Sequence, residues 1–352
     1  MRHVTAGKPI EVVIIDDSLV AREMLAQILS TDPAIQIVGM AVDGQDGVDM
    51  VARLKPDLVT MDIHMPRMDG IEATEQIMAF TPTPILVVSS SVHGEGMGAA
   101  FDALAAGALE VIKKPEPRDW ADLERIGREV IRKVKILSKV RVITHIRGRR
   151  GMLDRAVLRV PPRVTGGRSI VAIGSSTGGP SALLTVLCPL PAEFPLPIVI
   201  AQHIAEGFIP GLVGWLNGAC SVSVKAAEDG QELEPGVAYF APTGRNLKIS
   251  GGAMHFAAPE KGQLYIPSAD TLLASVAESH GTHGIGVLLT GMGADGARGL
   301  KAMRDAGAAT IAQDEATSTV FGMPKSAIEL GAADKVLAVQ DVAGEILRLA
   351  GL

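Results

Sequence analysis

The sequence predicts an α/β protein of two domains, each built on a doubly wound parallel sheet. Its 352 residues exceed what a single ordinary core accommodates, and a hydrophobic content of 47% is enough to fill two cores. Short apolar runs alternate with amphipathic stretches of helical period, first before and again after a segment rich in Lys and Arg. These observations predict domains at residues 10–133 and 169–350, joined by a basic linker over 134–168.

The first domain alternates five predicted strands with five predicted helices, the pattern of parallel strands joined by helical crossovers. The strands are predicted at 11–15, 36–41, 58–61, 85–88 and 109–112. The helices are predicted at 20–29, 45–53, 70–79, 97–105 and 121–135.

The second domain repeats the alternation and adds a β-hairpin. Its strands are predicted at 170–173, 197–201, 221–224, 237–240, 285–290 and 309–312, with helices at 180–188 and 296–306. Residues 247–249 and 254–256, joined by Ser250-Gly251-Gly252, predict the hairpin. The linker has one acidic residue, Asp154, and Pro and Gly pairs typical of a solvated hinge, with a nucleic-acid-binding patch as the alternative.

Composition argues against nucleic acid or an anionic membrane as the main partner, because the net charge is −6 and the pI about 5.8. No motif surrounds Cys188 or Cys220, so both are expected to be free thiols. The first nine residues lack the apolar core of a secretory signal, and no run of about 18 apolar residues predicts membrane insertion. We therefore expect a cytoplasmic protein.

Carboxylates gather at the predicted strand ends of the first domain. Asp16 and Asp17 directly follow its first strand, and Asp62 follows its third. The carboxyl ends of parallel strands share one edge of the sheet, where three carboxylates would repel one another unless a divalent cation joined them. An oxygen-only site suits Mg²⁺, with water and a backbone carbonyl, for which we expect that of His64, completing the ligands.

Two further polar groups are expected at this edge. Ser89 ends the fourth strand and Lys114 follows the fifth, where a cis bond to Pro115 would aim the lysine inward. A hydroxyl and an ammonium group beside a metal-bound carboxylate are what an acyl phosphate requires, so Asp62 is the predicted phosphoryl acceptor. The alternative is that the Asp pair, or Ser18, only caps the following helix.

Three segments of this domain, 12–17, 61–70 and 111–115, resemble the signature of bacterial response-regulator receiver domains. The resemblance covers about residues 10–133 and implies a flavodoxin-like fold. The roles it implies are phosphorylation at Asp62, Mg²⁺ binding by Asp16, Asp17 and Asp62, and sensing of the phosphoryl group by Ser89 and Lys114.

The first strand of the second domain runs into Gly174-Ser175-Ser176-Thr177-Gly178 and then an apolar helix. Gly-x-Ser-x-Gly between a strand and a helix is typical of a nucleophile elbow, which exposes its serine on a tight turn, here Ser176. One alternative is a phosphate-binding turn, although GxGxxG and Gly-Lys-Ser/Thr are absent. The other is that the adjacent Ser175 is the nucleophile.

A base and an acid are expected at the same edge of the sheet. His203 follows the strand 197–201, and Asp295 lies in the loop after the strand 285–290. Ser176, His203 and Asp295 would then form a catalytic triad, unless Asp295 only caps the helix 296–306. The spacing of His280 and His283 does not suit a metal site, and His255 lies in the hairpin.

Four segments of the second domain together resemble bacterial chemotaxis protein-glutamate methylesterases: Gly174–Pro180, Gln202-His203, Leu288–Ala297 and Ala312–Gly331. The resemblance implies that Ser176 is the nucleophile, His203 the base and Asp295 its orienting acid. Backbone N–H groups of Thr177 and Met292 are expected to hold the oxyanion.

That family hydrolyses γ-glutamyl methyl esters of chemoreceptors and commonly deamidates receptor glutamines, so the resemblance implies both activities. Mg²⁺ is expected only for phosphorylation, and no cofactor for ester hydrolysis. The implied partners are methyl-accepting chemoreceptors and a histidine kinase of a two-component system, with no nucleic acid. The unphosphorylated receiver is expected to cover the crevice. The alternatives are a receiver with a nucleic-acid-binding output and a hydrolase for another ester or amide.

The sequence departs from the family pattern at three places. Residues 204–206 lack the two prolines that often follow this histidine loop, Asn246 replaces a histidine, and Ile266 replaces an arginine before Pro267-Ser268. We expect these positions to line the approach to the crevice, and to bear on the choice of receptor rather than on the reaction class.

Overall fold

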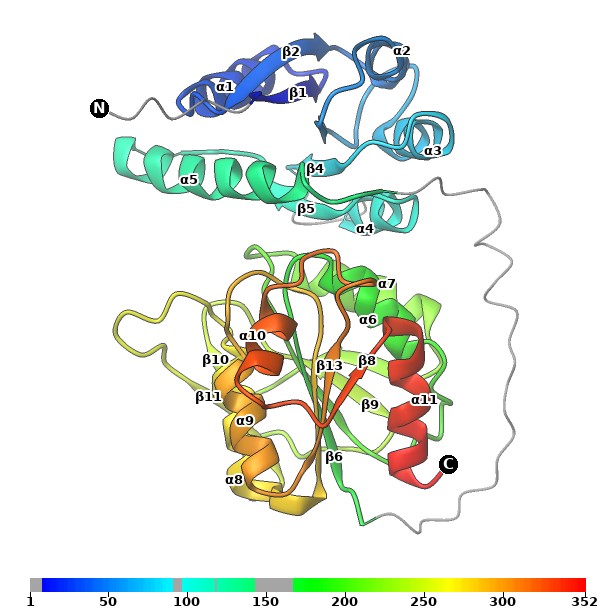
Figure 1. Ribbon diagram of the computed structural model, residues 1–352, viewed down its shortest axis with the longest axis vertical. Helices are drawn as coiled ribbons and strands as arrows, with labels where there is room; N and C mark the ends of the chain where they lie inside the picture. The colour runs from blue at the N-terminus through cyan, green and yellow to red at the C-terminus, as the bar shows by residue number, and fades with distance from the viewer. Residues whose placement is uncertain (1–7, 91–96, 118, 143–166) are drawn as a thin grey trace. The chain divides into compact units, whose positions relative to one another are not determined.

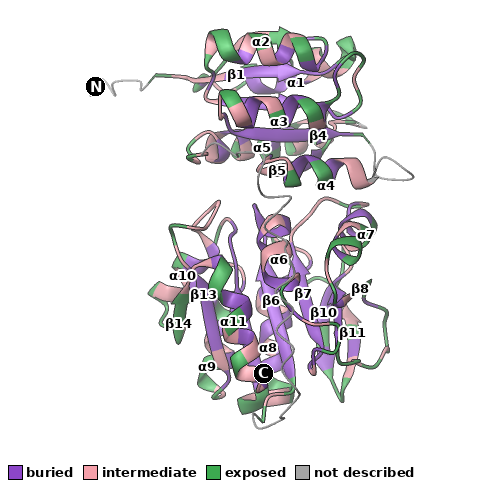
Figure 2. Ribbon diagram, turned by 90° about the vertical axis from the view of Figure 1, so that its right-hand side faces the viewer, coloured by how far each residue is buried: buried purple, intermediate pink, exposed green. Residues whose placement is uncertain are grey.

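The computed structural model describes residues 8–90, 97–117, 119–142 and 167–352 (Figure 1). The chain divides into two compact units, Met1–Asp154 and Arg155–Leu352. Both are α/β units built on parallel sheets, as predicted. The central strands of both sheets are buried, whereas edge strands such as β14 and the surrounding helices carry exposed residues (Figure 2).

The first unit contains a five-stranded parallel sheet in the order β2-β1-β3-β4-β5. Its strands are β1 Ile10–Ile15, β2 Ile35–Ala41, β3 Leu58–Met61, β4 Ile85–Ser89 and β5 Glu110–Lys113. Its helices are α1 Leu19–Ser30, α2 Gly44–Leu54, α3 Gly70–Phe80, α4 Met97–Ala105 and α5 Trp120–Leu137. The apolar runs that predict β1, β3 and β4 are almost wholly buried, as expected for parallel strands covered on both faces, whereas the edge strand β2 is only partly buried.

The predicted linker begins too early. Helix α5 continues to Leu137, so residues 134–137 are helical rather than part of a hinge. The physical reason is the burial of Val134 and Leu137, which pack into the core of the first unit and continue its apolar face. Most of the remaining predicted linker lies outside the described residues.

The second unit contains a seven-stranded parallel sheet in the order β14-β13-β12-β6-β7-β9-β8. Its strands are β6 Ile170–Ser175, β7 Ile198–Gln202, β8 Ser223–Ala226, β9 Val237–Phe240, β12 Gly284–Leu288, β13 Ala309–Gln313 and β14 Lys335–Leu337. The predicted hairpin is present as the antiparallel pair β10 Asn246–Ser250 and β11 Ala253–Ala257.

Six α-helices are found among the described residues of this unit. They are α6 Gly179–Leu187, α7 Ile209–Ala219, α8 Ala269–His280, α9 Ala297–Asp305, α10 Met323–Glu329 and α11 Val339–Ala350. The sequence predictions include α6 and α9 but not the other four, nor β14.

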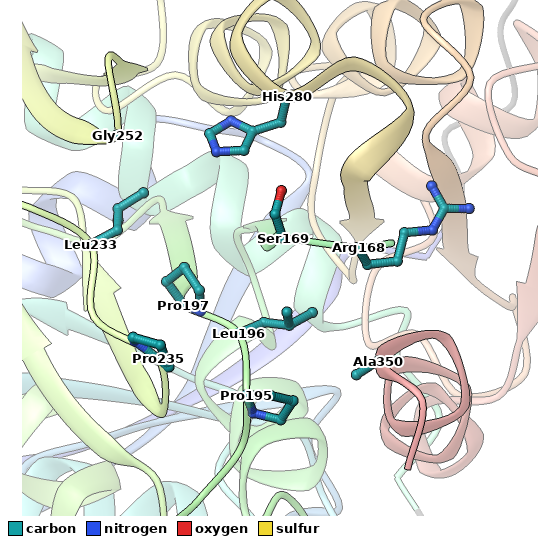
Figure 3. A pocket seen from close by; sticks show the side chains of 10 residues that line it. All are labelled: Arg168, Ser169, Pro195, Leu196, Pro197, Leu233, Pro235, Gly252, His280 and Ala350. Carbon is teal, nitrogen blue, oxygen red and sulfur yellow. The ribbon is translucent and has the colours of Figure 1, made fainter. Parts of the chain in front are cut away.

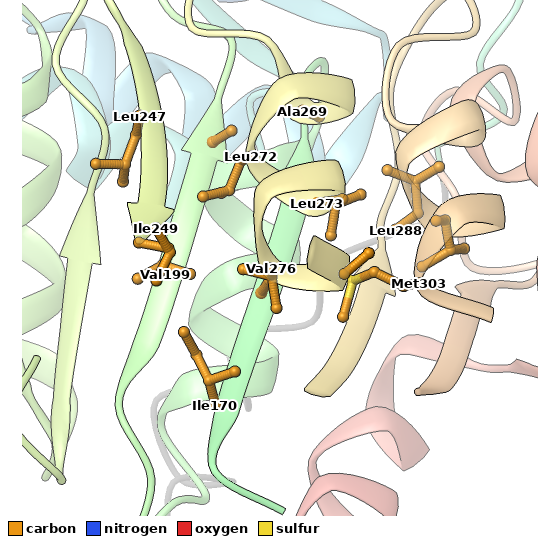
Figure 4. Packing of buried hydrophobic residues seen from close by; sticks show 14 of the residues in the cluster. Ile170, Val199, Leu247, Ile249, Ala269, Leu272, Leu273, Val276, Leu288 and Met303 are labelled. Carbon is orange, nitrogen blue, oxygen red and sulfur yellow. The ribbon is translucent and has the colours of Figure 1, made fainter. Parts of the chain in front are cut away.

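Helix α8 is central to the core of the second unit. Its buried face, with Leu272, Leu273 and Val276, packs over Ile170 of β6 and Val199 of β7 (Figure 4). This packing fixes the start of α8 against the carboxyl edge of the sheet, where the candidate site lies. Among the described residues, no helix is long and apolar enough to span a membrane.

Candidate functional site

The predicted triad residues come from three adjacent strands. Ser176 follows β6, His203 follows β7, and Asp295 lies in the loop between β12 and α9. Strand β6 pairs with β12 on one side and β7 on the other, so all three residues leave the same carboxyl edge. The strand order reverses at β6, and ligands of open α/β sheets bind at such a reversal.

The turn after β6 has the geometry of a strand-to-helix elbow. Gly178 adopts φ +75° at the cap of α6, a conformation that glycine accepts without strain. The Ser176 N–H donates to Thr290 O at 3.0 Å, and its carbonyl accepts from Gly179 N at 2.8 Å. Ser176 is buried but retains 9% exposure.

Ser175 is less suited to be a nucleophile. Its side chain is fully buried, and its hydroxyl donates to Gln202 Oε1 at 2.6 Å. This hydrogen bond holds the hydroxyl inside the core. The arrangement therefore favours Ser176 over its neighbour.

Gln202 joins the strand of the serine to the strand of the histidine. Its Nε2 donates to the Ser176 carbonyl at 2.9 Å and to the His203 carbonyl at 2.8 Å. A Cβ on Gly179 would lie 2.0 Å from Gln202 Oε1, which explains a glycine at this position. The sequence motif that contains Gln202 predicts no role for it, because no local pattern reveals a contact between strands.

The imidazole of His203 is tied to Asp295 by one nitrogen. His203 Nε2 lies 2.8 Å from Asp295 Oδ2, while its buried Nδ1 has no hydrogen-bond partner among the described residues. The ring also stacks on Tyr265, with centroids 4.7 Å apart and planes within 5°. Tyr265 is missing from the sequence predictions.

Asp295 accepts four hydrogen bonds. Besides His203, the donors are Ala269 N at 2.7 Å, Asp270 N at 3.1 Å and the Ser268 hydroxyl at 2.9 Å. Asp295 does not cap the helix that follows it, because α9 begins after Gly296 without a side-chain cap. It bonds instead to the amino end of α8, where the helix dipole favours a negative charge.

These contacts keep Asp295 ionised. Burial raises the pKa of its carboxyl, but the hydrogen bond and the attraction to His203, together with the bonds from Asp270 N and Ala269 N, hold the pKa below its usual value. An ionised carboxylate at this place fixes the proton of His203 on Nε2 and leaves Nδ1 as an acceptor.

One of the departures from the family pattern lies elsewhere than predicted. Asn246 does not line an approach: it is 1% exposed, and its Oδ1 accepts from Ser268 N at 2.9 Å. Its Nδ2 donates to Gln263 Oε1 at 2.8 Å. The Ser268 hydroxyl in turn donates to Asp295, so Asn246 and Ser268 together hold the Asp295 carboxylate in position. These polar side chains can be buried because residues distant in the chain satisfy their hydrogen bonds, and no local sequence pattern predicts such partners.

The loop after β12 brings further backbone groups to Ser176. A Cβ on Gly291 would lie 2.7 Å from the Ser176 Cβ, so the two backbones are in close contact beside Met292. Gly291 is held by Val320 O at 3.0 Å and by Met323 N at 2.8 Å. Among the described residues, no hydrogen bond from the Thr177 N–H is found.

The other histidines of the second unit lie elsewhere. His255 is exposed in β11, and His280 and His283 end α8 and the turn that follows. His280 lines a cavity of about 390 Å³ with Arg168 and Ser169 (Figure 3). Ser169 precedes β6, so this cavity lies at the amino edge of the sheet, opposite the predicted triad.

The first unit brings together the predicted acidic cluster. Carboxylate oxygens of Asp16, Asp17 and Asp62 lie within 4.8 Å of one another, and Lys114 Nζ lies 2.8 Å from Asp16 and 2.9 Å from Asp62. Ser89 is buried at the end of β4.

The cluster has the charge and donors that Mg²⁺ requires. Three carboxylates and one ammonium leave two negative charges, which one divalent cation would balance. Burial raises the pKa of the Asp62 carboxyl, and repulsion from the Asp16 charge raises it further. The hydrogen bond from Lys114 lowers this pKa but does not offset the other two effects. Burial opposes a charged Lys114, but hydrogen bonds to both carboxylates raise its pKa above the usual value.

Ser18 caps α1 by accepting from Ala21 N, one of the alternatives that the sequence offers, whereas Asp16 accepts from Ser18 N at 2.9 Å. One detail differs from the sequence interpretation. The Lys114–Pro115 bond is not cis, since the one cis bond among the described residues is Ile266–Pro267. Lys114 reaches the carboxylates without it.

Comparisons with known proteins agree with the two-unit organisation. The model of the CheB methylesterase family matches residues 171–346, and that of the response regulator receiver domain matches 12–122. A "Protein-glutamate methylesterase/protein-glutamine glutaminase 2" of Anaeromyxobacter dehalogenans is 44% identical over 95% of each chain. A similarly named protein of Syntrophus aciditrophicus is 43% identical over 97% of this chain and 99% of its own.

Solved structures from Thermotoga maritima are also similar. The CheB methylesterase catalytic domain is 41% identical, with a TM-score of 0.49, and covers 52% of this chain and 98% of its own. The CheB response regulator domain is 36% identical, with a TM-score of 0.34, and covers 38% and 99%. From the family models and the full-length relatives, the chain belongs to the CheB methylesterase family and carries a response regulator receiver domain ahead of its catalytic domain.

Proposed function

We propose that this protein removes methyl esters from glutamate side chains of chemoreceptors, using Ser176, His203 and Asp295, under control of phosphorylation at Asp62. The observation that carries the proposal is the meeting of a serine elbow and a His–Asp pair at one carboxyl edge. This arrangement performs acyl transfer on several unrelated folds. The relatives' names supply the substrate class.

His203 acts as the general base through Nδ1. Its Nε2 is committed to Asp295, so the unpartnered Nδ1 takes the Ser176 proton as the hydroxyl oxygen attacks the ester carbonyl. The four hydrogen bonds on Asp295 hold the carboxylate in place while the imidazolium forms.

The tetrahedral oxyanion is stabilised by the backbone N–H groups of Thr177 and Met292, at the amino end of α6 and in the loop beside Ser176. When the intermediate collapses, His203 returns its proton to the leaving oxygen, and methanol departs. Water then attacks the acyl-enzyme by the same route and releases glutamate. With an amide in place of the ester the leaving group is ammonia, which would account for glutaminase activity.

The receiver supplies the control. The Asp62 carboxylate attacks the phosphorus of a phosphohistidine on a histidine kinase, the P–N bond breaks and an acyl phosphate forms. Bound Mg²⁺, held by Asp16, Asp17 and Asp62, would neutralise charge at this site and favour the ionised carboxylate. Lys114 and Ser89 would then contact the phosphoryl oxygens. A phosphodonor kinase and the receptor substrate both support a cytoplasmic location, which we include in the proposal.

The chemistry is tested by methanol release from membranes that carry methylated chemoreceptor. We expect release by the intact protein that rises with Mg²⁺ and a small phosphodonor, and that disappears in Ser176→Ala. Ser181→Ala, at a half-buried serine of α6 to which the mechanism assigns no step, is the matched control and should keep activity. With a folded protein, absence of methanol under all conditions would refute the substrate assignment, and release of ammonia alone would make the protein a glutaminase.

The control is tested separately. Asp62→Asn should keep the basal rate and lose the response to phosphodonor. A fragment of residues 168–352 should be faster than the unphosphorylated full-length protein if the receiver restrains the hydrolase. Equal rates would contradict restraint and leave the triad proposal intact.

A further inference from the structure

Tyr265 is in contact with the candidate catalytic base, but the mechanism above gives it no step. It lies in the segment between β11 and α8, and its ring stacks on the His203 imidazole at 4.7 Å with the planes nearly parallel. Its hydroxyl end lies against Gly293, because a Cβ added there would be 2.9 Å from Tyr265 Oη. Tyr265 therefore lies between the base and the loop that carries Met292.

The segment that carries Tyr265 is anchored on both sides. On one side Gln263 bonds to the buried Asn246 at 2.8 Å and to Glu260 N at 3.0 Å. On the other side Ser268 donates from its backbone to Asn246 and from its hydroxyl to Asp295. Both anchors meet at one buried side chain, so the tyrosine ring is presented from a fixed segment.

A ring in this place supplies what the hydrogen bond to Asp295 lacks. A single contact at Nε2 fixes one atom of the imidazole, but the ring can still rotate about that contact. A parallel aromatic face restricts the rotation and keeps Nδ1 in the plane required for proton transfer. The face of a tyrosine also favours a cation, so it stabilises the imidazolium that forms in the transition state.

We propose that Tyr265 is a positioning residue for His203, holding the plane of the imidazole by stacking. The inference rests on the proposed triad. It requires the aromatic face of Tyr265 but not its hydroxyl, which separates it from a role in hydrogen bonding to substrate.

The test compares Tyr265→Phe with Tyr265→Leu in the full-length protein, assayed by methanol release from methylated receptor membranes. Phe keeps the stacking face, so its kcat should stay within about twofold of the unchanged protein. Leu removes the face, and kcat should fall by roughly threefold to tenfold with KM unchanged. Lys261→Ala, an exposed change in the same segment, controls for disturbance of the segment.

Each result decides between the proposals. An unchanged kcat in Tyr265→Leu, or an equal loss in Phe and Leu, overturns the positioning role. A raised KM with normal kcat would make Tyr265 a substrate contact and also overturn it. If Tyr265→Leu fails to fold, Tyr265→Gln at this partly exposed position gives the same comparison. Failure of the triad itself is recognised independently, because Ser176→Ala would then keep its methanol release.

Discussion

Replacing Gln202 by Met should lower the stability of the second unit more than replacing an exposed glutamine of that unit by Met. Gln202 is 1% exposed, and its amide makes three hydrogen bonds, to the Ser175 hydroxyl at 2.6 Å and to two backbone carbonyls at 2.9 and 2.8 Å. Met has a similar shape and volume, so the change removes the hydrogen bonds without creating a cavity.

The expected loss follows from the two groups left without a partner, the Ser175 hydroxyl and the His203 carbonyl, because the Ser176 carbonyl keeps its bond from Gly179 N. A buried polar group without a partner costs about 1–3 kcal/mol, so two cost about 2 kcal/mol at the lower limit and up to about 6 kcal/mol if nothing relaxes. Because a whole domain is stable by about 5–15 kcal/mol, even the lower limit is a large fraction. We expect a loss near the lower limit, since the Ser175 hydroxyl can rotate toward another acceptor.

The free energy of unfolding is measured by urea denaturation followed by far-UV circular dichroism. The control is Gln340→Met, an exposed glutamine of α11 in the same unit, which should change stability by less than about 0.5 kcal/mol. Methanol release should also fall in Gln202→Met, because the amide joins the backbones of Ser176 and His203. A loss in Gln202→Met below about 1 kcal/mol, or one no larger than that of Gln340→Met, would refute the argument that the Gln202 amide holds β6 and β7 together.

Three further perturbations follow from the structure. Asn246→Leu leaves the buried Ser268 N–H without its acceptor and should lower stability by about 1–3 kcal/mol, seen as a fall in Tm; an unchanged Tm would show that Ser268 is held by other contacts. Gly70→Ala would place a Cβ 2.0 Å from the Asp62 carbonyl oxygen, so thermal unfolding should show the receiver destabilised by about 1–3 kcal/mol and phosphorylation slowed; normal values for both would contradict the packing there. The hydrogen bond from Arg348, with that from Lys335, lowers the pKa of Glu345 from 4.5 to about 2, which stabilises the fold above pH 4.5 and is lost as the pH falls toward 2. Glu345→Gln should therefore be less stable at pH 7 but match the unchanged protein near pH 2, and a difference independent of pH would exclude this ion pair as the cause.

The sequence by itself determined the fold class and the strand ends that carry the candidate residues. Parallel strands joined by helices place all their carboxyl ends at one edge, so Ser176, His203 and Asp295 could be expected together once three strands were recognised. The same rule predicted the cluster of Asp16 and Asp62. Apolar runs and glycine turns are local patterns, so they can be recognised from the sequence alone.

Only the tertiary structure decided what supports those residues. Gln202, Asn246 and Tyr265 act through contacts with residues 17 to 62 positions away, and no local pattern marks such partners. Helix α8 was not predicted, yet its amino end holds Asp295. A sequence pattern reports which face of an element is apolar, whereas the partner of a buried polar group depends on how distant elements pack.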